Sequence, residues 1–525
     1  MKKILLSILF IFVAVLSFQF EANGEDEFKI ITDSRVTQMV DGVTHTKIIG
    51  KVVFNGVQTN QQINYIGANL SENTELSLAT GDMFKSYTNV ATYRGAECWG
   101  MGSVLSMIAR INTNNPSTEV IGGVNGDAYL INSTGQPLGI HIRDYRLINK
   151  HINGGSSTAV GYKDDGSVII GDPVYSGYHI NVYNSDNELK FQKPVVVNQL
   201  PGNDEIAVFF SNYNTELPAE MKKTIFDAIE IKFDAQDKST SSVYFGEGKL
   251  RETLLEKHTP QFEEFVVTGA FDESILKSGD YVIVQDKITG EFADVRHAMG
   301  LWHPLIIDGQ TYQPSYVNPE IHPRSAVGIK EDGTVFFVSV DGRQSHKQMD
   351  GMNFAQLIGL MRYFGAVEAY NLDGGGSSTF VIRNDENNRA YEVQNSPSDS
   401  RVRSVANGMF FVRGKTAPMP DSIIGSDNRT KLVAPNRIVV DNGNISFNEV
   451  ANASGYYINV NGVDYYSATN SIFINFPNGT FNISVRVIGN SSYESSDYSE
   501  SVIYQVYREE VSDLIELFKN YTKYN

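Results

Sequence analysis

The sequence predicts an α+β protein: a large domain with a mixed β-sheet, βαβ units and packing helices, followed by a small all-β sandwich domain. Two observations lead to this prediction. Segments with the apolar spacing of helices alternate with strand-like segments up to about residue 413, whereas only short alternating segments between turn signals follow residue 433. The chain of 525 residues is also too long for a single core, so two or three domains are expected.

Changes in composition divide the chain into five segments, with Pro418 and Pro420 in the linker and Pro435 just after it. The predicted segments are a signal peptide (1–24), the large domain (25–413), a linker (414–432), the sandwich domain (433–508) and a C-terminal tail (509–525). The large domain is further divided into an N-terminal strand region (25–100), two motif-bearing regions (101–175 and 290–413) and a less patterned middle (180–289).

The N-terminus has the layout of a secretory signal. Lys2 and Lys3 precede an apolar run from Ile4 to about Phe20, and small polar residues follow at Asn23 and Gly24. We therefore expect a secreted or cell-surface protein. An uncleaved anchor is the alternative, because the apolar run approaches the length that spans a bilayer.

Charge and cysteine content exclude some classes of partner and fold. The formal net charge is -18 and the sequence pI is about 5.0, which argues against nucleic acid or an anionic membrane as the main partner. The single cysteine, Cys98, cannot form an internal disulfide, so the fold does not depend on such bonds.

Two helix–strand–loop units resemble each other weakly along the chain. In the first, a predicted helix at 101–112 precedes a buried strand that ends in "VNGDAY", with Asn125 and Asp127. In the second, a predicted helix at 353–366 precedes a strand that ends in "NLDGGG", with Asp373. A hairpin at 324–343, closed near Asp332, comes before the second helix and ends at Asp341.

The second unit predicts where two carboxylates lie. A strand, a helix and a strand with short connections form a βαβ unit whose two strands run parallel. Their carboxyl ends then lie at one edge of the sheet, where ligands of open α/β sheets bind. Asp341 and Asp373 should emerge side by side there if the two strands are neighbours.

Three glycines and two hydroxyls follow Asp373 directly: Gly374, Gly375, Gly376, Ser377 and Ser378. Glycines allow main-chain N–H groups to approach a ligand and form a nest for an anion, and the serine hydroxyls add donors. The alternative is a glycine-rich turn capped by a structural aspartate.

Basic residues near these motifs are candidates for an anion site. Arg324, beside His322 in "IHPRSAVG", could hold a phosphate with two hydrogen bonds or could be a solvated surface residue. Arg401 and Arg403 follow Asp399 in "SPSDSRVRS", where they could contact phosphate or form an ion pair.

Four ordered motifs resemble the phosphodiester glycosidase family: "GVNGDAY", "HPRSAVGIKEDGTVFFVSVDGR", "AYNLDGGGSSTFV" and "NSPSDSRVRSVANGMFFV". The resemblance covers roughly Val43 to Val412 and is tightest from His322 onward. It implies hydrolysis of a sugar-1-phosphodiester, an α-N-acetylglucosamine-1-phosphodiester in particular, at the glycosidic C–O bond. Cell-wall or extracellular polysaccharide is the expected substrate of a secreted member. Ser325 stands where a threonine is frequent, which retains the hydroxyl.

The resemblance suggests roles for the candidate residues. Glycoside cleavage usually needs two carboxyl groups, and a phosphodiester is already a good leaving group. The catalytic candidates are Asp373, Asp341 and Asp127, without a choice of acid, base or nucleophile. The phosphate and substrate candidates are Arg324, Gly374, Gly375, Gly376, Ser377, Ser378, Asn125, Asn371, Arg403 and His322.

The sequence requires no cofactor, although three aspartates could together bind Ca²⁺ or another divalent cation. A zinc centre is not expected, because the chain has neither a CxxC pair nor an HExxH motif. Two other functions stay open: a non-catalytic polysaccharide-binding or adhesion protein, and a metal-dependent phosphodiesterase that cuts the P–O bond.

The sandwich segment resembles a fibronectin type III module through "ISFNEV", "YYINVNG", "GTFNISVRVIG" and "SSDYSES". Phe447 replaces the usual tryptophan of the second strand. The resemblance implies a spacer or docking unit, to which we assign no ligand.

Overall fold

The computed structural model describes residues 28–84, 99–416 and 430–507, except for 116, 133, 152–154, 214, 233–243, 262–263, 313–318, 386–388, 454, 462, 468, 489–492 and 495. The predicted signal peptide (1–24), Cys98, most of the linker (414–432) and the tail (509–525) lie outside these residues. Across the described part of the chain, no helix combines the length and apolar character needed to cross a membrane.

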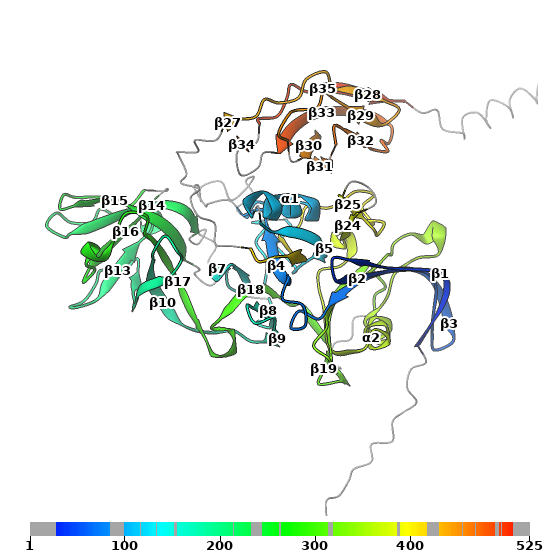
Figure 1. Ribbon diagram of the computed structural model, residues 1–525, viewed down its shortest axis with the longest axis horizontal. Helices are drawn as coiled ribbons and strands as arrows, with labels where there is room; N and C mark the ends of the chain where they lie inside the picture. The colour runs from blue at the N-terminus through cyan, green and yellow to red at the C-terminus, as the bar shows by residue number, and fades with distance from the viewer. Residues whose placement is uncertain are drawn as a thin grey trace, which may run out of the picture.

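Two facing sheets form the centre of the large domain (Figure 1). The first has eight strands in the order β1-β2-β3-β22-β21-β23-β19-β20: β1 (Phe28–Val40), β2 (Val43–Phe54), β3 (Val57–Ala68), β19 (His303–Ile307), β20 (Gln310–Thr311), β21 (Arg324–Lys330), β22 (Val335–Val340) and β23 (Ala366–Asn371). The second has five in the order β25-β24-β5-β26-β4: β4 (Leu76–Asp82), β5 (Glu119–Asn125), β24 (Phe380–Asn384), β25 (Ala390–Val393) and β26 (Asn407–Arg413). One apolar core joins them, with Phe337 and Tyr370 of the first sheet against Phe380 and Phe411 of the second.

One helix covers the outer face of each sheet. α2 (Phe354–Tyr363) packs Leu357 and Leu360 onto the eight-stranded sheet and begins with a capping box at Asn353. α1 (Val104–Asn114) packs onto the five-stranded sheet and is capped by Ser103. Both predicted helices are therefore confirmed within a few residues at each end.

The predicted α+β class with βαβ units is wrong. In the described residues the large domain is mostly antiparallel β-structure with only two α-helices. β22 and β23 do run in the same direction, but β21 lies between them and pairs antiparallel with both. The helix therefore connects strands that are separated by one strand, and no parallel neighbours form.

The predicted hairpin at 324–343 is confirmed, and the less patterned middle forms a sheet of its own. β8 (Ala159–Lys163) pairs with β9 (Val168–Gly171), as β21 does with β22. β8 and β9 belong to a second five-stranded sheet, in the order β7-β6-β18-β8-β9. Its other strands are β6 (His141–Arg143), β7 (Arg146–Asn149) and β18 (Val295–Gly300).

The inserted sheet, as we call the eight strands from residue 174 to 289, stands beside the core (green in Figure 1). Its order is β11-β10-β17-β15-β14-β16-β13-β12: β10 (Val174–Tyr183), β11 (Leu189–Pro194), β12 (Val196–Val197), β13 (Ile206–Phe209), β14 (Lys223–Lys232), β15 (Phe245–Leu254), β16 (Glu264–Gly269) and β17 (Tyr281–Thr289). It has a core of its own, which includes Phe226, Phe265 and Phe271.

The C-terminal residues form antiparallel sheets of three and four strands over one core, above α1 in Figure 1. The strands are β28 (Val439–Asp441), β29 (Asn444–Ser446), β30 (Gly455–Val460), β31 (Val463–Ser467), β32 (Ser471–Phe473), β33 (Gly479–Ile488) and β35 (Val502–Val506), beside the short pair β27 (Thr430–Lys431) and β34 (Tyr493–Glu494). The Tyr457 hydroxyl donates to the Ser106 carbonyl of α1 over 3.3 Å, so the module contacts the large domain. Its fibronectin type III character stays a prediction.

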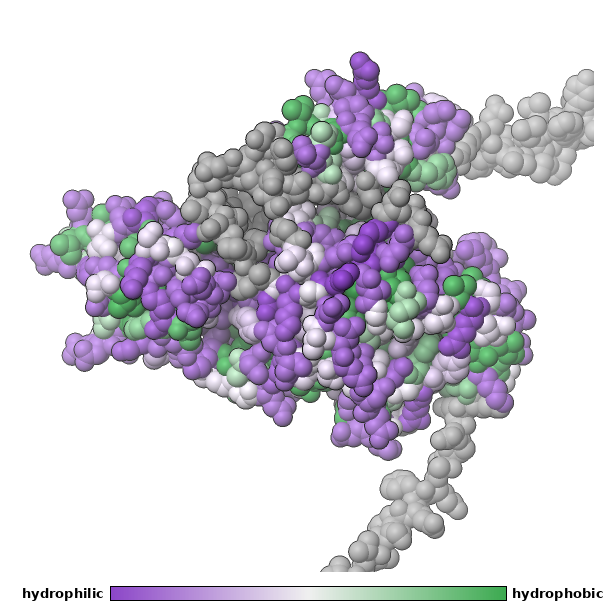
Figure 2. Space-filling view, viewed as in Figure 1, coloured by the Kyte–Doolittle hydropathy of each residue, from purple (hydrophilic) through white to green (hydrophobic). Residues whose placement is uncertain are grey.

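The surface agrees with the acidic composition. The face in Figure 2 is largely hydrophilic, with apolar residues scattered in small groups. A large apolar patch that would mark an obligate interface is not visible on that face.

Candidate active site

The loops after β5 and β23 meet, so the two helix–strand–loop units converge on one place. The Asp373 N–H donates to the Gly126 carbonyl over 2.9 Å, and Asn125 Nδ2 donates to the Asp373 carbonyl over 2.7 Å. Each sheet thus contributes one loop, and the loops carry Asp127 and Asp373. The second acid beside Asp373 comes from the facing sheet, not from the next strand of the same sheet.

Asp127 is a buried carboxyl group held by main-chain donors. It is 2% exposed, and its carboxylate accepts the Gly139 N–H. A Cβ on Gly300 would lie 2.7 Å from Asp127 Oδ2, so only glycine fits against this carboxylate. Burial, with a smaller contribution from the negative charge of Asp373, raises the pKa of Asp127 to about 7.

Asp373 is partly exposed, unlike Asp127. Burial raises the pKa of Asp373 to about 6, although Ser377 and Arg403 act in the opposite direction. The two acids therefore share one site in which both carboxyl groups hold protons more strongly than in water.

The glycine loop is a single 3-10 turn, η6 (Gly375–Ser377), with Gly375 at a φ of 63°. Its N–H groups are mostly used within the chain: Gly375 donates to the Pro323 carbonyl, Ser377 to Gly374 and Ser378 to Gly375, over 2.9, 3.2 and 3.3 Å. These three N–H groups therefore do not form the predicted anion nest, because the carbonyls of Pro323, Gly374 and Gly375 already accept them.

Close packing of side chains, rather than exposed main chain, explains the glycines. A Cβ on Gly375 would lie 3.0 Å from Arg343 Nη2, and one on Gly376 would overlap Arg403 and Asp399. The triple glycine thus lets two guanidinium groups lie directly against the loop that follows Asp373.

Arg403 and Arg343 are the cations beside this loop. Arg403 Nε donates to Asp399 Oδ2 over 2.7 Å, and its Nη1 lies 3.4 Å from Ser377 Oγ. Arg343 is exposed, has a φ of 56° and has its Nη2 3.4 Å from His322 Nδ1. Arg403 and His322, predicted from sequence, are thus brought to the loop, and Arg343 joins them.

Arg324 is placed differently from its predicted role. Its Nε donates to the Met352 carbonyl over 2.9 Å, and its Nη2 donates to the Glu320 carbonyl over 2.6 Å. The guanidinium also stacks 4.6 Å from the centre of the Phe354 ring. Main-chain carbonyls thus accept hydrogen bonds from two sides of the Arg324 guanidinium. Arg324 therefore holds the segments at Glu320 and Met352 in place beside the glycine loop.

Asp341 does not join the other two acids. β22 and β23 are separated by one strand, which puts their ends about 10 Å apart. The Asp341 carboxylate accepts the Ser396 N–H over 3.0 Å, and burial raises its pKa to about 6. Asn395, next to Ser396, bonds the Ser378 carbonyl over 2.8 Å, so Asp341 supports the glycine loop from behind.

Of the polar side chains predicted to bind substrate, Asn125 already makes hydrogen bonds within the protein, whereas Asn371 and Ser378 each keep a polar oxygen without a partner in the part of the chain that the structure describes. Asn125 Oδ1 accepts from Ser325 Oγ and the Thr379 N–H over 2.7 and 3.0 Å, which makes Asn125 a brace between the loops. Asn371 Oδ1 and Ser378 Oγ are buried with no hydrogen-bond partner among the described residues.

No cluster of three or more His, Cys, Asp or Glu residues suited to a metal occurs among the described residues. The three-aspartate calcium site is not assembled, because Asp341 is bonded to a different loop from Asp127 and Asp373. A divalent-cation requirement stays a prediction.

Sequence reasoning missed three residues of the site. Arg343, two positions after Asp341, and Tyr129, inside "VNGDAY", lay within motifs that were singled out. Tyr129 donates from its hydroxyl to the Ser404 carbonyl over 3.0 Å, and burial raises its pKa. Asn407 accepts the Asp127 N–H over 2.9 Å. It also lay within a quoted motif, but it joins the site through the pairing of β26 with β5, which the sequence did not predict.

Comparison with protein families gives one match: residues 253–412 match the family model described as phosphodiester glycosidase. The matched region contains Asp341, Asp373, Arg343 and Arg403 but not Asp127. It indicates a hydrolase of the glycosidase type.

Curated and solved proteins give weaker likenesses. The SPbeta prophage-derived uncharacterized protein YomE of Bacillus subtilis (strain 168) is 30% identical over 117 residues, which are 21% of this chain and 18% of that relative. The chain thus spans under a fifth of the length of the curated relative that it matches.

Two solved structures are similar at 14% sequence identity. One is a hypothetical protein from Synechocystis, with a TM-score of 0.42 over 74% of this chain and 68% of that chain. The other is the catalytic domain of zebrafish N-acetylglucosamine-1-phosphodiester alpha-N-acetylglucosaminidase, auto-inhibited by its pro-peptide, with a TM-score of 0.36 over 73% of this chain and 87% of that chain.

Proposed function

We propose that this protein hydrolyses a sugar-1-phosphodiester, with N-acetylglucosamine as the sugar, at the glycosidic C–O bond. The observation that carries the proposal is the pair Asp127 and Asp373, two carboxyl groups with raised pKa values beside a loop flanked by two arginines. The glycosidase family match and the name of the zebrafish enzyme support this substrate class.

Asp373 is the group that faces the substrate. It is the more exposed acid of the pair, and it ionises first because its pKa is about 6 against about 7 for Asp127. As a carboxylate, Asp373 stabilises positive charge that develops at the sugar C1 or activates the attacking water.

Arg343 and Arg403 hold the departing phosphate. Both lie against the glycine loop next to Asp373, and guanidinium groups bind phosphate oxygens with two hydrogen bonds. The C1–O bond breaks, water supplies a hydroxyl to C1, and the phosphate leaves as a monoester.

Asp127 acts through Asp373 as a positioning residue. Asp127 is buried, so we do not assign it a direct contact with substrate. While Asp127 is neutral, Asp373 is the only negative charge of the pair. When Asp127 ionises, a second negative charge disfavours the anionic substrate.

Secretion, action on a cell-wall or extracellular polysaccharide, and a spacer role for a fibronectin type III-like module are parts of the same proposal. The basic, apolar N-terminal run supports export. The separately folded C-terminal sandwich, with its own apolar core, is suited to hold the large domain away from a surface.

Product analysis tests the proposal. The protein is incubated with a synthetic α-N-acetylglucosamine-1-phosphodiester, and the products are separated. Free N-acetylglucosamine with a phosphomonoester supports the glycosidase. N-acetylglucosamine 1-phosphate identifies a phosphodiesterase instead, and binding without turnover identifies a non-catalytic protein. Parallel reactions with EDTA report any need for a divalent cation.

A further inference from the structure

A groove of about 540 Å³ lies between the inserted sheet and the five-stranded sheet that contains β7 and β18. One wall is the face of β10 and β17. The other is the turn from Asp144 to Arg146 with the segment that leads into β18. None of the residues proposed to act in hydrolysis lines this groove.

An aromatic pair forms the floor at one end. Tyr183 of β10 lies opposite Tyr281 of β17 in the register, and their rings stack at 5.3 Å with an angle of 12°. Tyr183 is partly exposed, and the Tyr281 hydroxyl donates to Asn187 Oδ1 over 2.8 Å. The Arg146 guanidinium lies 5.9 Å from the centre of the Tyr281 ring, so Tyr183 is the ring of the pair that can offer an apolar surface to a ligand.

A row of amide and amine groups runs along the same wall. Lys287 Nζ donates to Gln192 Oε1 over 2.8 Å, and Gln192 Nε2 donates to Asn181 Oδ1 over 2.7 Å. Gln192 is exposed and Lys287 partly so, and an ammonium group carries three donors. The row therefore offers both donors and acceptors to hydroxyl groups.

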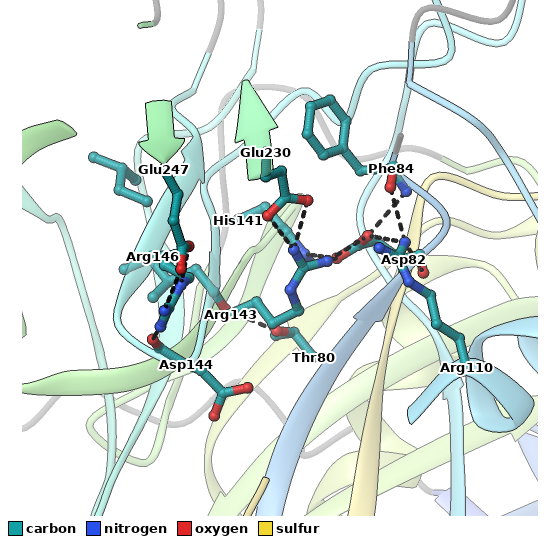
Figure 3. Close-up of polar contacts among 12 residues, drawn as sticks. Thr80, Asp82, Phe84, Arg110, His141, Arg143, Asp144, Arg146, Glu230 and Glu247 are labelled. Atoms are coloured by element: carbon teal, nitrogen blue, oxygen red, sulfur yellow. Dashed lines mark hydrogen bonds and ion pairs between the residues drawn. The ribbon is translucent and has the colours of Figure 1, made fainter. Parts of the chain in front are cut away.

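The walls are held at a fixed distance by bonds across the groove. The Leu147 N–H donates to Gln285 Oε1 over 2.9 Å, and Gln285 Nε2 donates to the Tyr145 carbonyl over 3.1 Å. Deeper in, Arg146 binds Glu247 through two hydrogen bonds of 2.5 and 2.8 Å (Figure 3). The groove is therefore preformed rather than dependent on a ligand.

The charges around the groove are largely neutralised. Arg146 pairs with Glu247, and Arg296 pairs with Asp144 and Asp164 over 3.1 Å each. Among the described residues, Lys287 donates to the amide of Gln192 and not to a carboxylate, so its positive charge is the part of the lining that is not neutralised in this way. An aromatic ring and a row of amides suit a sugar ring, whose C–H face is apolar and whose hydroxyls point outward.

One strand connects the groove to the catalytic acids. Val295 and Arg296, at the start of β18, line the groove, and Gly300, at its end, packs against Asp127. Six strand residues span about 17 Å. This separation excludes a single sugar that touches both places, but a polymer chain can reach both.

We propose that the groove is a second saccharide-binding site, which holds a neutral N-acetylglucosamine-containing stretch of a polymer while the catalytic acids act elsewhere on it. The choice of sugar rests on the proposed function, whereas binding in the groove does not require catalysis.

The test uses a hexamer of β-1,4-linked N-acetylglucosamine as the probe and isothermal titration calorimetry as the measurement. The wild-type chain and Asp373→Asn should bind the hexamer equally, because Asp373 is outside the groove. Tyr183→Ala should weaken binding at least tenfold, and Lys287→Ala by a smaller factor. Tyr507→Ala, at a tyrosine that is 80% exposed beyond the groove, is the matched control.

Two results would overturn the groove proposal: no binding of the hexamer by wild type, or equal binding by wild type and by folded Tyr183→Ala and Lys287→Ala. Turnover of the small phosphodiester is measured in the same variants. A hexamer that binds in the groove without turnover of the small substrate rejects the hydrolase and keeps the groove. The reverse result rejects only the groove.

Discussion

Two aspartates at or just after strand ends have pKa values that shift in opposite directions. Asp82, the last residue of β4, is surrounded by Arg110, Arg143 and His141 at 2.9, 2.7 and 2.8 Å (Figure 3). Burial alone would raise its pKa, but the two guanidinium groups hold the pKa of Asp82 far below its usual range. Asp373 is also at a strand end, yet burial prevails there and raises its pKa to about 6.

The difference lies in how the negative charge is compensated. Arg143 bridges Asp82 to Glu230 of the inserted sheet, so this network fastens one part of the fold to another. The cation that lowers the pKa of Asp373 is Arg403, and Arg403 is already paired with Asp399. A buried carboxylate with full compensation is structural, whereas one left undercompensated beside another acid is suited to chemistry.

Replacement of Asp373 should have the largest effect on activity. Asp373→Asn removes the ionised group that faces the substrate, and we expect turnover to fall by about a thousandfold or more. The melting temperature at neutral pH should not fall, because the ionised carboxyl group that is lost is disfavoured in the fold. Asp332→Asn, in an exposed turn, is the matched control and should keep full activity. Turnover by Asp373→Asn near the wild-type rate would remove Asp373 from the mechanism.

Replacement of Asp82 should have the largest effect on stability. Asp82→Asn leaves Arg110 and Arg143 without their shared anion, and we expect a loss of about 3–5 kcal/mol in the free energy of unfolding. Urea unfolding measures it. The folded pKa of Asp82 is depressed, so its stabilisation is present above the ordinary carboxyl pKa and is lost as pH falls. A stable Asp82→Asn protein would mean that the network does not hold the inserted sheet.

Asp127→Asn should increase the free energy of unfolding, whereas Asp82→Asn should decrease it. The pKa of Asp127 is raised in the fold, so wild type loses stability as pH rises from about 4 to 7 and the Asp127 carboxyl ionises. The amide oxygen that the substitution introduces can still accept the Gly139 N–H. We expect the variant to be more stable than wild type by about 1–3 kcal/mol at pH 8, with less difference at pH 5. Thermal unfolding at both pH values measures this, and a variant that is less stable at pH 8 contradicts it.

Arg343→Ala should have the smallest of these effects. Loss of one exposed guanidinium beside the glycine loop should raise the KM for the phosphodiester about tenfold. Arg343→Lys should restore part of the affinity, because it restores the charge without the fork. Arg413→Ala, at another exposed arginine, is the control. An unchanged KM in Arg343→Ala would leave Arg403 as the phosphate ligand.

Local patterns in the sequence predicted what local interactions determine. The two helices, the hairpin at 324–343 and the loops at Asp127 and Asp373 follow from apolar spacing, capping residues and glycines near one another in the chain. The weak resemblance of the two helix–strand–loop units did not predict that their loops meet, which the structure shows through the bond from the Asp373 N–H to the Gly126 carbonyl.

Sheet order could not be predicted in the same way. The strand that separates β22 from β23 is chosen by pairing over long distances in sequence, and Asp341 was misplaced for that reason. Arg324 was assigned to phosphate because no local signal shows that Met352 and Glu320 supply carbonyls to it. The less patterned middle gave no strand order for the inserted sheet, because pairs such as β10 with β17 form between segments about 100 residues apart in the chain.

The pH dependence of kcat/KM in wild type and Asp127→Asn tests the central claim most directly. If Asp373 works ionised while Asp127 is neutral, wild-type activity rises with a pKa near 6 and falls with a pKa near 7, and the variant loses the falling limb only. A variant that keeps both limbs would contradict the pairing of these two acids.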